Sequence, residues 1–159
     1  MTLRICLASA GLLLVVMSVA RPGQVEAVGG CIPGSYLAIE ASGTQSLWTF
    51  SSDGTFEVAS SAERAFNFGH IQGSWQRDSA HAARAVGLHF GFLPAPVGAG
   101  VPPQWVTRID VSLAFERVCE TFAGEFALRF YDEGEDPLDE RVVAAEGRDT
   151  VTGRRIDVP

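Results

Sequence analysis

Two long segments of the chain alternate between bulky and small or polar side chains. From Trp105 to Phe115 every second residue is bulky, and residues 122–131 resume the alternation after a short break. A period of two suits a strand with one buried face, whereas a helix would scatter these residues around its surface. We therefore predict two neighbouring antiparallel strands. The side chains expected on the same face are Trp105, Thr107, Ile109, Val111, Leu113, Phe115, Phe122, Gly124, Phe126, Leu128 and Phe130.

The strongest local turn signal is Asp53-Gly54, which separates two short alternating segments. Asp-Gly favours the tight turn of a two-stranded hairpin. We expect its strands at residues 46–50 and 55–59, and an earlier strand at residues 34–40.

The middle of the chain predicts two further strands. Residues 66–77 contain glycines of the kind that mark bulges or bends. In residues 86–92 bulky side chains alternate with very small ones, and we expect the bulky face, which includes Phe90, to point inward. Residues 93–103 contain four prolines, so they are expected to form a long loop. A last strand is expected over residues 142–148, continuing after a bend to Ile156.

These segments give about eight strands and no helix beyond one possible turn at residues 60–65. Short reversals join all of them except near the proline-rich loop. An antiparallel up-and-down barrel is the expected all-β fold, because closure removes the exposed edges of an open sheet. A two-sheet sandwich is the alternative.

The N-terminal residues are typical of an export signal. Arg4 precedes an apolar run of 15 residues, 5–19, and cleavage is expected after Ala27 or Ala20. An uncleaved anchor is the alternative, but a membrane-spanning helix needs about 20 apolar residues. We therefore expect a signal peptide at residues 1–27 and a single secreted or periplasmic domain at residues 28–159.

The charge of the chain argues against two classes of partner. Removing residues 1–27 reduces 12 arginines to ten and 19 acidic residues to eighteen, so the formal charge changes from −7 to −8; the chain has no lysine. Nucleic acids and anionic membranes bind clustered cations. We therefore expect neither as a partner of the mature protein.

The cysteines predict one disulfide. Cys6 leaves with the signal peptide, which leaves Cys31 before the first strand and Cys119 between the two long strands. Exported proteins meet oxidising conditions, so we expect a bond between Cys31 and Cys119. The alternative is a lipoprotein site at Cys31, but Arg21, Pro22 and Glu26 separate this cysteine from the apolar run.

Several short motifs resemble those of small secreted bacterial barrels of the lipocalin-like (calycin) type. Lipocalins carry Gly-x-Trp on the first strand, and an arginine from the last strand lies over that tryptophan; here Tyr36 takes its place. Allene oxide cyclase and dirigent barrels are similar in strand number. The resemblance implies a closed barrel. The motifs are Gly34-Ser35-Tyr36, Asp53-Gly54-Thr55-Phe56, Gly73-Ser74-Trp75 and Thr152-Gly153-Arg154-Arg155-Ile156.

The bulky faces predict a pocket for a small hydrophobic ligand inside the barrel. A barrel of about eight strands either encloses one small molecule or fills with side chains, so a packed core that serves a surface or interaction module is the alternative. The proline-rich loop, residues 93–103, is the expected lid. The candidate ligand-binding residues are Trp48, Phe90, Trp105, Ile109, Phe126 and Phe130.

An enzymatic alternative is a barrel isomerase or cyclase that acts on a hydrophobic substrate. His89 would serve as acid or base beside Arg129 or Tyr131, although a histidine on an exposed sheet face needs no such role. No nucleophile motif, phosphate loop or dinucleotide fingerprint occurs. We assign no catalytic residue and no cofactor.

No metal site is expected from the sequence. His70, His81 and His89 lack the spacing of metal ligands. The acidic residues 132–136 do not match a calcium loop, so a solvated turn is the preferred interpretation.

One ion pair is expected on the surface of the sheet. Arg108 and Asp110 are two positions apart on one strand and therefore on the same face, so we expect them to form this surface ion pair.

Overall fold

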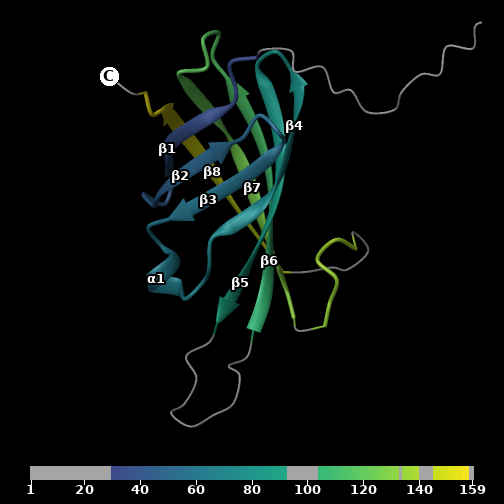
Figure 1. The fold of residues 1–159 in the computed structure, drawn as a ribbon. Helices are drawn as coiled ribbons and strands as arrows, with labels where there is room; N and C mark the ends of the chain where they lie inside the picture. The colour runs from purple at the N-terminus through teal and green to yellow at the C-terminus, as the bar shows by residue number, and fades with distance from the viewer. Residues whose placement is uncertain (1–29, 93–103, 133, 140–144, 158–159) are drawn as a thin grey trace, which may run out of the picture.

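The strands form one closed antiparallel barrel in which each strand pairs with the next and the last strand pairs with the first (Figure 1). A computed structural model describes residues 30–92, 104–132, 134–139 and 145–157. The predicted all-β up-and-down barrel is confirmed. The elements are β1 (Gly34–Glu40), β2 (Gln45–Phe50), β3 (Thr55–Ser60), α1 (Glu63–Phe66), β4 (Ile71–Ser79), β5 (Ala82–Phe92), β6 (Gln104–Phe115), β7 (Thr121–Tyr131) and β8 (Ala145–Arg155).

Three predictions fall outside the described residues. These are the signal peptide at residues 1–27, the loop at residues 93–103 and the start of the last strand at residues 142–144. Within the described part of the chain, no helix has the length and apolar character needed to cross a bilayer.

The predicted hairpin forms between β2 and β3. Gly54 adopts a φ of 91°, a left-handed conformation that glycine accepts without strain. A carboxylate oxygen of Asp53 accepts a 2.9 Å hydrogen bond from the backbone N–H of Thr55. This bond lowers the pKa of Asp53, because it favours the charged carboxylate. Asp53 and Gly54 therefore form the tight hairpin turn that the sequence predicted.

The long strands β6 and β7 pair along their length, with Ile109 opposite Leu128 and Val111 opposite Phe126. The alternating face of β6 from Thr107 to Phe115 is buried, as predicted. Figure 1 shows these strands forming one wall of the barrel. The alternation therefore identified the inner face of this wall correctly.

Strand β5 has the opposite orientation to the one predicted. Its small face is buried, whereas Phe90 lies outside with 57% of its surface exposed. A Cβ atom on Gly91 would lie 2.0 Å from the Trp105 ring, so the neighbouring strand already occupies the space beside β5. The prediction that Phe90 faces the interior is wrong, because large side chains of β4 and β6 require small residues opposite them.

Two element boundaries differ from the predictions. The segment before β4 forms the one-turn helix α1, and Asn67 ends that helix in a left-handed conformation with φ 53°. The strand β4 therefore starts at Ile71 rather than at residue 66. Strand β8 runs without the expected bend, since it pairs with β7 over residues 145–154 and with β1 over residues 151–155.

Aromatic rings fill the end of the barrel where β1 begins and β8 ends. The Tyr36 ring packs edge-on against the rings of Phe50, Phe115 and Phe122, with centroids 5.4–5.9 Å apart. Edge-to-face rings pack densely and leave little free volume. We call this the packed end.

Arg155 seals the packed end. Its guanidinium group donates hydrogen bonds to the backbone carbonyls of Cys31 at 2.6 Å and Pro33 at 2.7 Å. It also lies over the Tyr36 ring. Gly34 permits this approach, because a Cβ atom there would lie 2.7 Å from an arginine nitrogen. An arginine of the last strand thus covers the aromatic residue of the first strand, as the resemblance implied.

Candidate functional site

A cavity of about 610 Å³ lies at the opposite end of the barrel. Its lining comes from the ends of β1, β3, β5 and β7, from β2, from the starts of β4, β6 and β8, and from α1. Five of the six predicted ligand-binding residues line the cavity, and Phe90 does not. These five are Trp48, Trp105, Ile109, Phe126 and Phe130.

Trp48 forms the boundary between the cavity and the packed end. Its ring lies 5.5 Å from Phe56 and 5.7 Å from Phe122, and it also lines the cavity. The indole N–H donates a 3.0 Å hydrogen bond to the Ser46 hydroxyl. The Ser46 hydroxyl in turn donates to Glu40 at 3.4 Å. This chain of bonds holds the indole in one orientation.

Polar groups at the rim of the cavity already have partners. Glu40 also accepts a hydrogen bond from the Ser42 hydroxyl, and burial raises the pKa of its carboxyl group. Asp149 accepts from the backbone N–H groups of Ser42 and Thr150. Arg148 pairs with Glu146. The rim is therefore polar and internally bonded, while the wall is largely apolar.

His89 lies in the cavity wall, and only 7% of its surface is exposed. The expectation that His89 lies on an exposed sheet face is wrong, because β5 buries its face of small residues, which includes His89, and exposes Phe90. The imidazole packs on Phe68 with ring centroids 4.6 Å apart. Its Nδ1 atom is buried and has no hydrogen-bond partner among the described residues. Burial lowers the pKa of His89, since a buried imidazole loses the hydration of its charged form.

Thr107 lies directly opposite His89 on the neighbouring strand β6. Its hydroxyl is also buried and unpartnered among the described residues. Sequence reasoning placed Thr107 on the inner face but saw no role for it. Only the strand register brings the two polar side chains together.

The groups proposed for an enzyme do not converge. Arg129 lies on the outer wall, where it contacts Asp110 at 3.2 Å and Glu146 at 3.6 Å. Asp110 chiefly raises the pKa of Arg129. Tyr131 follows Phe130 and therefore points away from the cavity. Neither residue shares a face with His89.

The predicted ion pair between Arg108 and Asp110 forms at 2.7 Å. Arg108 is buried, so the pair is not the surface contact that was expected. Arg108 also donates a 3.3 Å hydrogen bond to the Pro137 carbonyl, in the turn that follows β7. The pair ties this turn to the outer wall.

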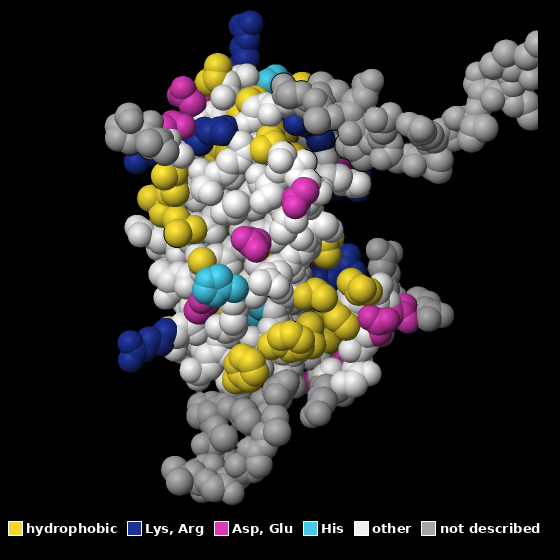
Figure 2. Space-filling view, viewed as in Figure 1, with side chains coloured by type: hydrophobic (Ala, Val, Ile, Leu, Met, Phe, Trp, Pro, Cys, Tyr) yellow, Lys and Arg dark blue, Asp and Glu magenta, His cyan; other side chains and the backbone are white. Residues whose placement is uncertain are grey.

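Exposed apolar side chains lie near the cavity. Phe66 of α1 and Phe130 of β7 both line it, and Phe130 has 42% of its surface exposed. Figure 2 shows hydrophobic side chains, in yellow, gathered toward the lower end of the molecule. Exposed apolar clusters of this kind commonly accompany ligand sites.

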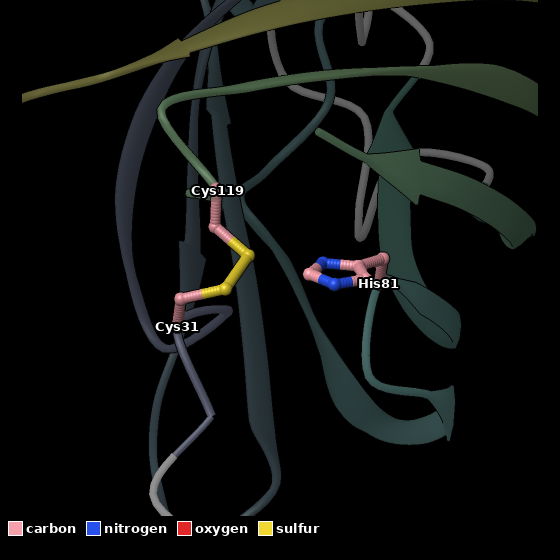
Figure 3. A group of neighbouring side chains, drawn as sticks. All are labelled: Cys31, His81 and Cys119. Atoms are coloured by element: carbon pink, nitrogen blue, oxygen red, sulfur yellow. A yellow bond between two sulfur atoms is a disulfide. The ribbon is translucent and has the colours of Figure 1, made fainter. Parts of the chain in front are cut away.

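The predicted disulfide between Cys31 and Cys119 is confirmed (Figure 3), with the Cα atoms 5.5 Å apart. The His81 ring, in the turn between β4 and β5, lies beside it, and the three potential ligand atoms are within 4.8 Å of one another. Metals bind thiolates. The oxidised pair therefore leaves only His81 as a ligand here. The sulfur of Cys31 is bonded, which speaks against the lipoprotein alternative.

Comparisons of the chain with protein-family models, with curated proteins and with solved structures gave no match. The eight-stranded closed barrel is compatible with a lipocalin-like fold.

Proposed function

We propose that the protein binds one small hydrophobic molecule in the cavity at the end of the barrel opposite Tyr36. The observation that carries this proposal is the cavity of about 610 Å³ walled by Trp48, Trp105, Phe126 and Phe130. Ligand pockets span about 300–1,000 Å³ and combine apolar walls with a few polar groups. An eight-stranded barrel is wide enough for one small ligand.

The contrast between the two ends of the barrel supports this proposal over a wholly packed core. Rings close the packed end around Tyr36, whereas Phe130 keeps 42% of its surface exposed. A ligand that covers such side chains gains about 2.5 kcal/mol for each 100 Å² of apolar surface removed from water. The cavity end thus has apolar surface available for a ligand.

We further propose that the protein is exported and belongs with the lipocalin-like barrels. The signal-like residues 1–27 and the Cys31–Cys119 bond support export. The Tyr36–Arg155 contact supports the likeness to lipocalins. Mass spectrometry of the secreted protein would test export, because cleavage after Ala27 or Ala20 defines a new N-terminus.

A fluorescence titration tests ligand binding. N-phenyl-1-naphthylamine becomes fluorescent in apolar sites, and Trp48 and Trp105 would transfer energy to it from the cavity wall. We expect saturable binding that weakens in Trp105→Ala and is retained in Trp75→Phe, since Trp75 does not line the cavity. Absence of saturable fluorescence, or equal binding by both variants, would overturn the proposal.

A further inference from the structure

Among the described residues that line the cavity, His89 carries a buried polar atom that lacks a partner. Its Nδ1 atom has no well-formed hydrogen bond to a described residue, although only 7% of the His89 surface is exposed. A buried polar group without a partner destabilises a fold, and an apolar side chain of the same size would avoid that loss. The imidazole therefore requires an explanation that packing does not supply.

The rim groups do not share this property. Glu40, Asp149 and Arg148 all have protein partners. An incoming polar group would have to compete with those partners at the rim, whereas the Nδ1 atom of His89 has no partner among the described residues for it to displace. Polar recognition is therefore directed to the β5 wall rather than to the rim.

We infer that the cavity selects an apolar molecule that carries one hydroxyl group, an alcohol or a phenol, and that this hydroxyl hydrogen-bonds to the imidazole of His89. This inference rests on the proposed function and names the ligand class of the same cavity. A neutral imidazole presents one N–H donor and one acceptor nitrogen, and a hydroxyl group can serve either.

The surroundings of His89 limit which polar group of a ligand could hydrogen-bond to the imidazole. The Phe68 ring covers one side of the imidazole at 4.6 Å. The hydroxyl of Thr107, its cross-strand neighbour, also has no hydrogen-bond partner among the described residues. Burial is the main influence on the pKa of His89 and lowers it, while a backbone hydrogen bond at Phe90 and the charge of Glu63 act in the opposite direction. A neutral ring among apolar side chains suits an uncharged hydroxyl better than a carboxylate.

Two matched probes test the inference. 2-Naphthol and 2-methylnaphthalene have nearly the same shape and differ by a hydroxyl in place of a methyl group. Each is titrated against bound N-phenyl-1-naphthylamine in the wild type, in His89→Phe and in His81→Phe. The last variant is the control, because His81 is exposed in the turn between β4 and β5. The measured quantity is the ratio of the two dissociation constants in each protein.

We expect the dissociation constant of 2-naphthol, divided by that of 2-methylnaphthalene, to rise about three- to tenfold in His89→Phe, because one neutral hydrogen bond contributes that much to affinity. The ratio should stay unchanged in His81→Phe. The same ratio in all three proteins would overturn the hydroxyl inference while leaving the hydrophobic cavity intact. Failure of N-phenyl-1-naphthylamine to bind the wild type would instead overturn the proposed function, and the inference with it.

A second measurement does not depend on a folded variant. In the ¹⁵N-labelled wild type, 2-naphthol should shift the imidazole nitrogen resonances of His89, and 2-methylnaphthalene should leave their hydrogen-bond state unchanged. Equal shifts with both probes would show that the hydroxyl does not contact the imidazole.

Discussion

The guanidinium carbon of Arg155 lies 5.7 Å from the centre of the Tyr36 ring, so the last strand covers the first at the packed end of the barrel. The Tyr36 hydroxyl donates a 2.8 Å hydrogen bond to the Ile32 carbonyl. The same arginine bonds the carbonyls of Cys31 and Pro33. One side chain thus connects the segment before β1 to β8.

Replacing Arg155 by alanine should lower the free energy of unfolding by about 2–3 kcal/mol, because three charge-assisted hydrogen bonds, one of them to the Tyr36 hydroxyl, and a cation–π contact are lost. Denaturant unfolding followed by tryptophan fluorescence measures the change. Arg154→Ala is the matched control, since this neighbour is exposed on the other face of β8. An equal decrease in the free energy of unfolding in both variants would show that the contact with Tyr36 does not stabilise the fold.

Removing the disulfide should destabilise the fold more strongly. The Cys31–Cys119 bond closes a loop with a sequence separation of 88, and the chain-entropy model gives about 4 kcal/mol for a loop of that length. The double variant Cys31→Ser/Cys119→Ser should unfold at correspondingly lower denaturant concentration. Reductant should have no further effect on it, and a wild type that is indifferent to reductant would contradict the prediction.

Filling the cavity should weaken ligand binding without unfolding the protein. Gly147 lines the cavity, and a Cβ atom built on it meets nothing within 4 Å. We expect Gly147→Leu to weaken N-phenyl-1-naphthylamine binding by about tenfold or more by occupying ligand volume. The free energy of unfolding should stay equal to that of the wild type or rise slightly, because replacing glycine reduces the conformational entropy of the unfolded chain.

The control for this cavity-filling variant is Thr150→Leu, which adds a similar side chain at an exposed position of β8. It should bind the probe as the wild type does. Undiminished binding by Gly147→Leu would place the ligand elsewhere on the molecule.

Acid should reveal the burial of His89. Its folded pKa is lowered mainly by desolvation, so below about pH 6.5 the unfolded chain takes up a proton before the folded protein does. The His89 contribution to stability is therefore present above about pH 6.5 and is lost as the pH falls through the folded pKa. Unfolding free energies measured between pH 5 and 7.5 should depend less on pH in His89→Phe.

Glu40 contributes to the pH dependence with the opposite sign. Burial raises its pKa, so its protonated form favours the folded state and that contribution is lost as the pH rises above its unfolded pKa of about 4.5. Comparing His89→Phe with the wild type cancels the Glu40 contribution. Identical pH profiles in these two proteins would show that His89 is not buried in its neutral form.

Most of the wall could be predicted from local pattern, but the orientation of β5 could not. In β6 the bulky residues face inward, and periodicity alone identified them correctly. In β5 the same rule placed Phe90 inside, whereas the Trp105 ring lies where a side chain on Gly91 would be. Which face of a strand points inward depends on the volume of its neighbours, and a single strand's sequence does not contain that information.

The candidate site was predicted in part for a related reason. The aromatic wall, including Trp48 and Phe126, follows from alternation, and the pairing of Cys31 with Cys119 follows from cysteine counting. The opposition of His89 and Thr107 depends on the register between β5 and β6. Free volume depends on how all eight strands tilt and pack, so the choice between a cavity and a filled core needed the structure.

The pairing of β1 with β8 constrains when the protein can fold. Residues 36–40 pair with residues 151–155, so the barrel cannot close until β8 has been made and, for an exported chain, translocated. Such long-range pairing folds slowly, and until closure both β1 and β8 have unpaired edges that can join other chains. The seam that Arg155 covers is therefore a place where the nascent barrel is open to misassembly until β8 pairs with β1.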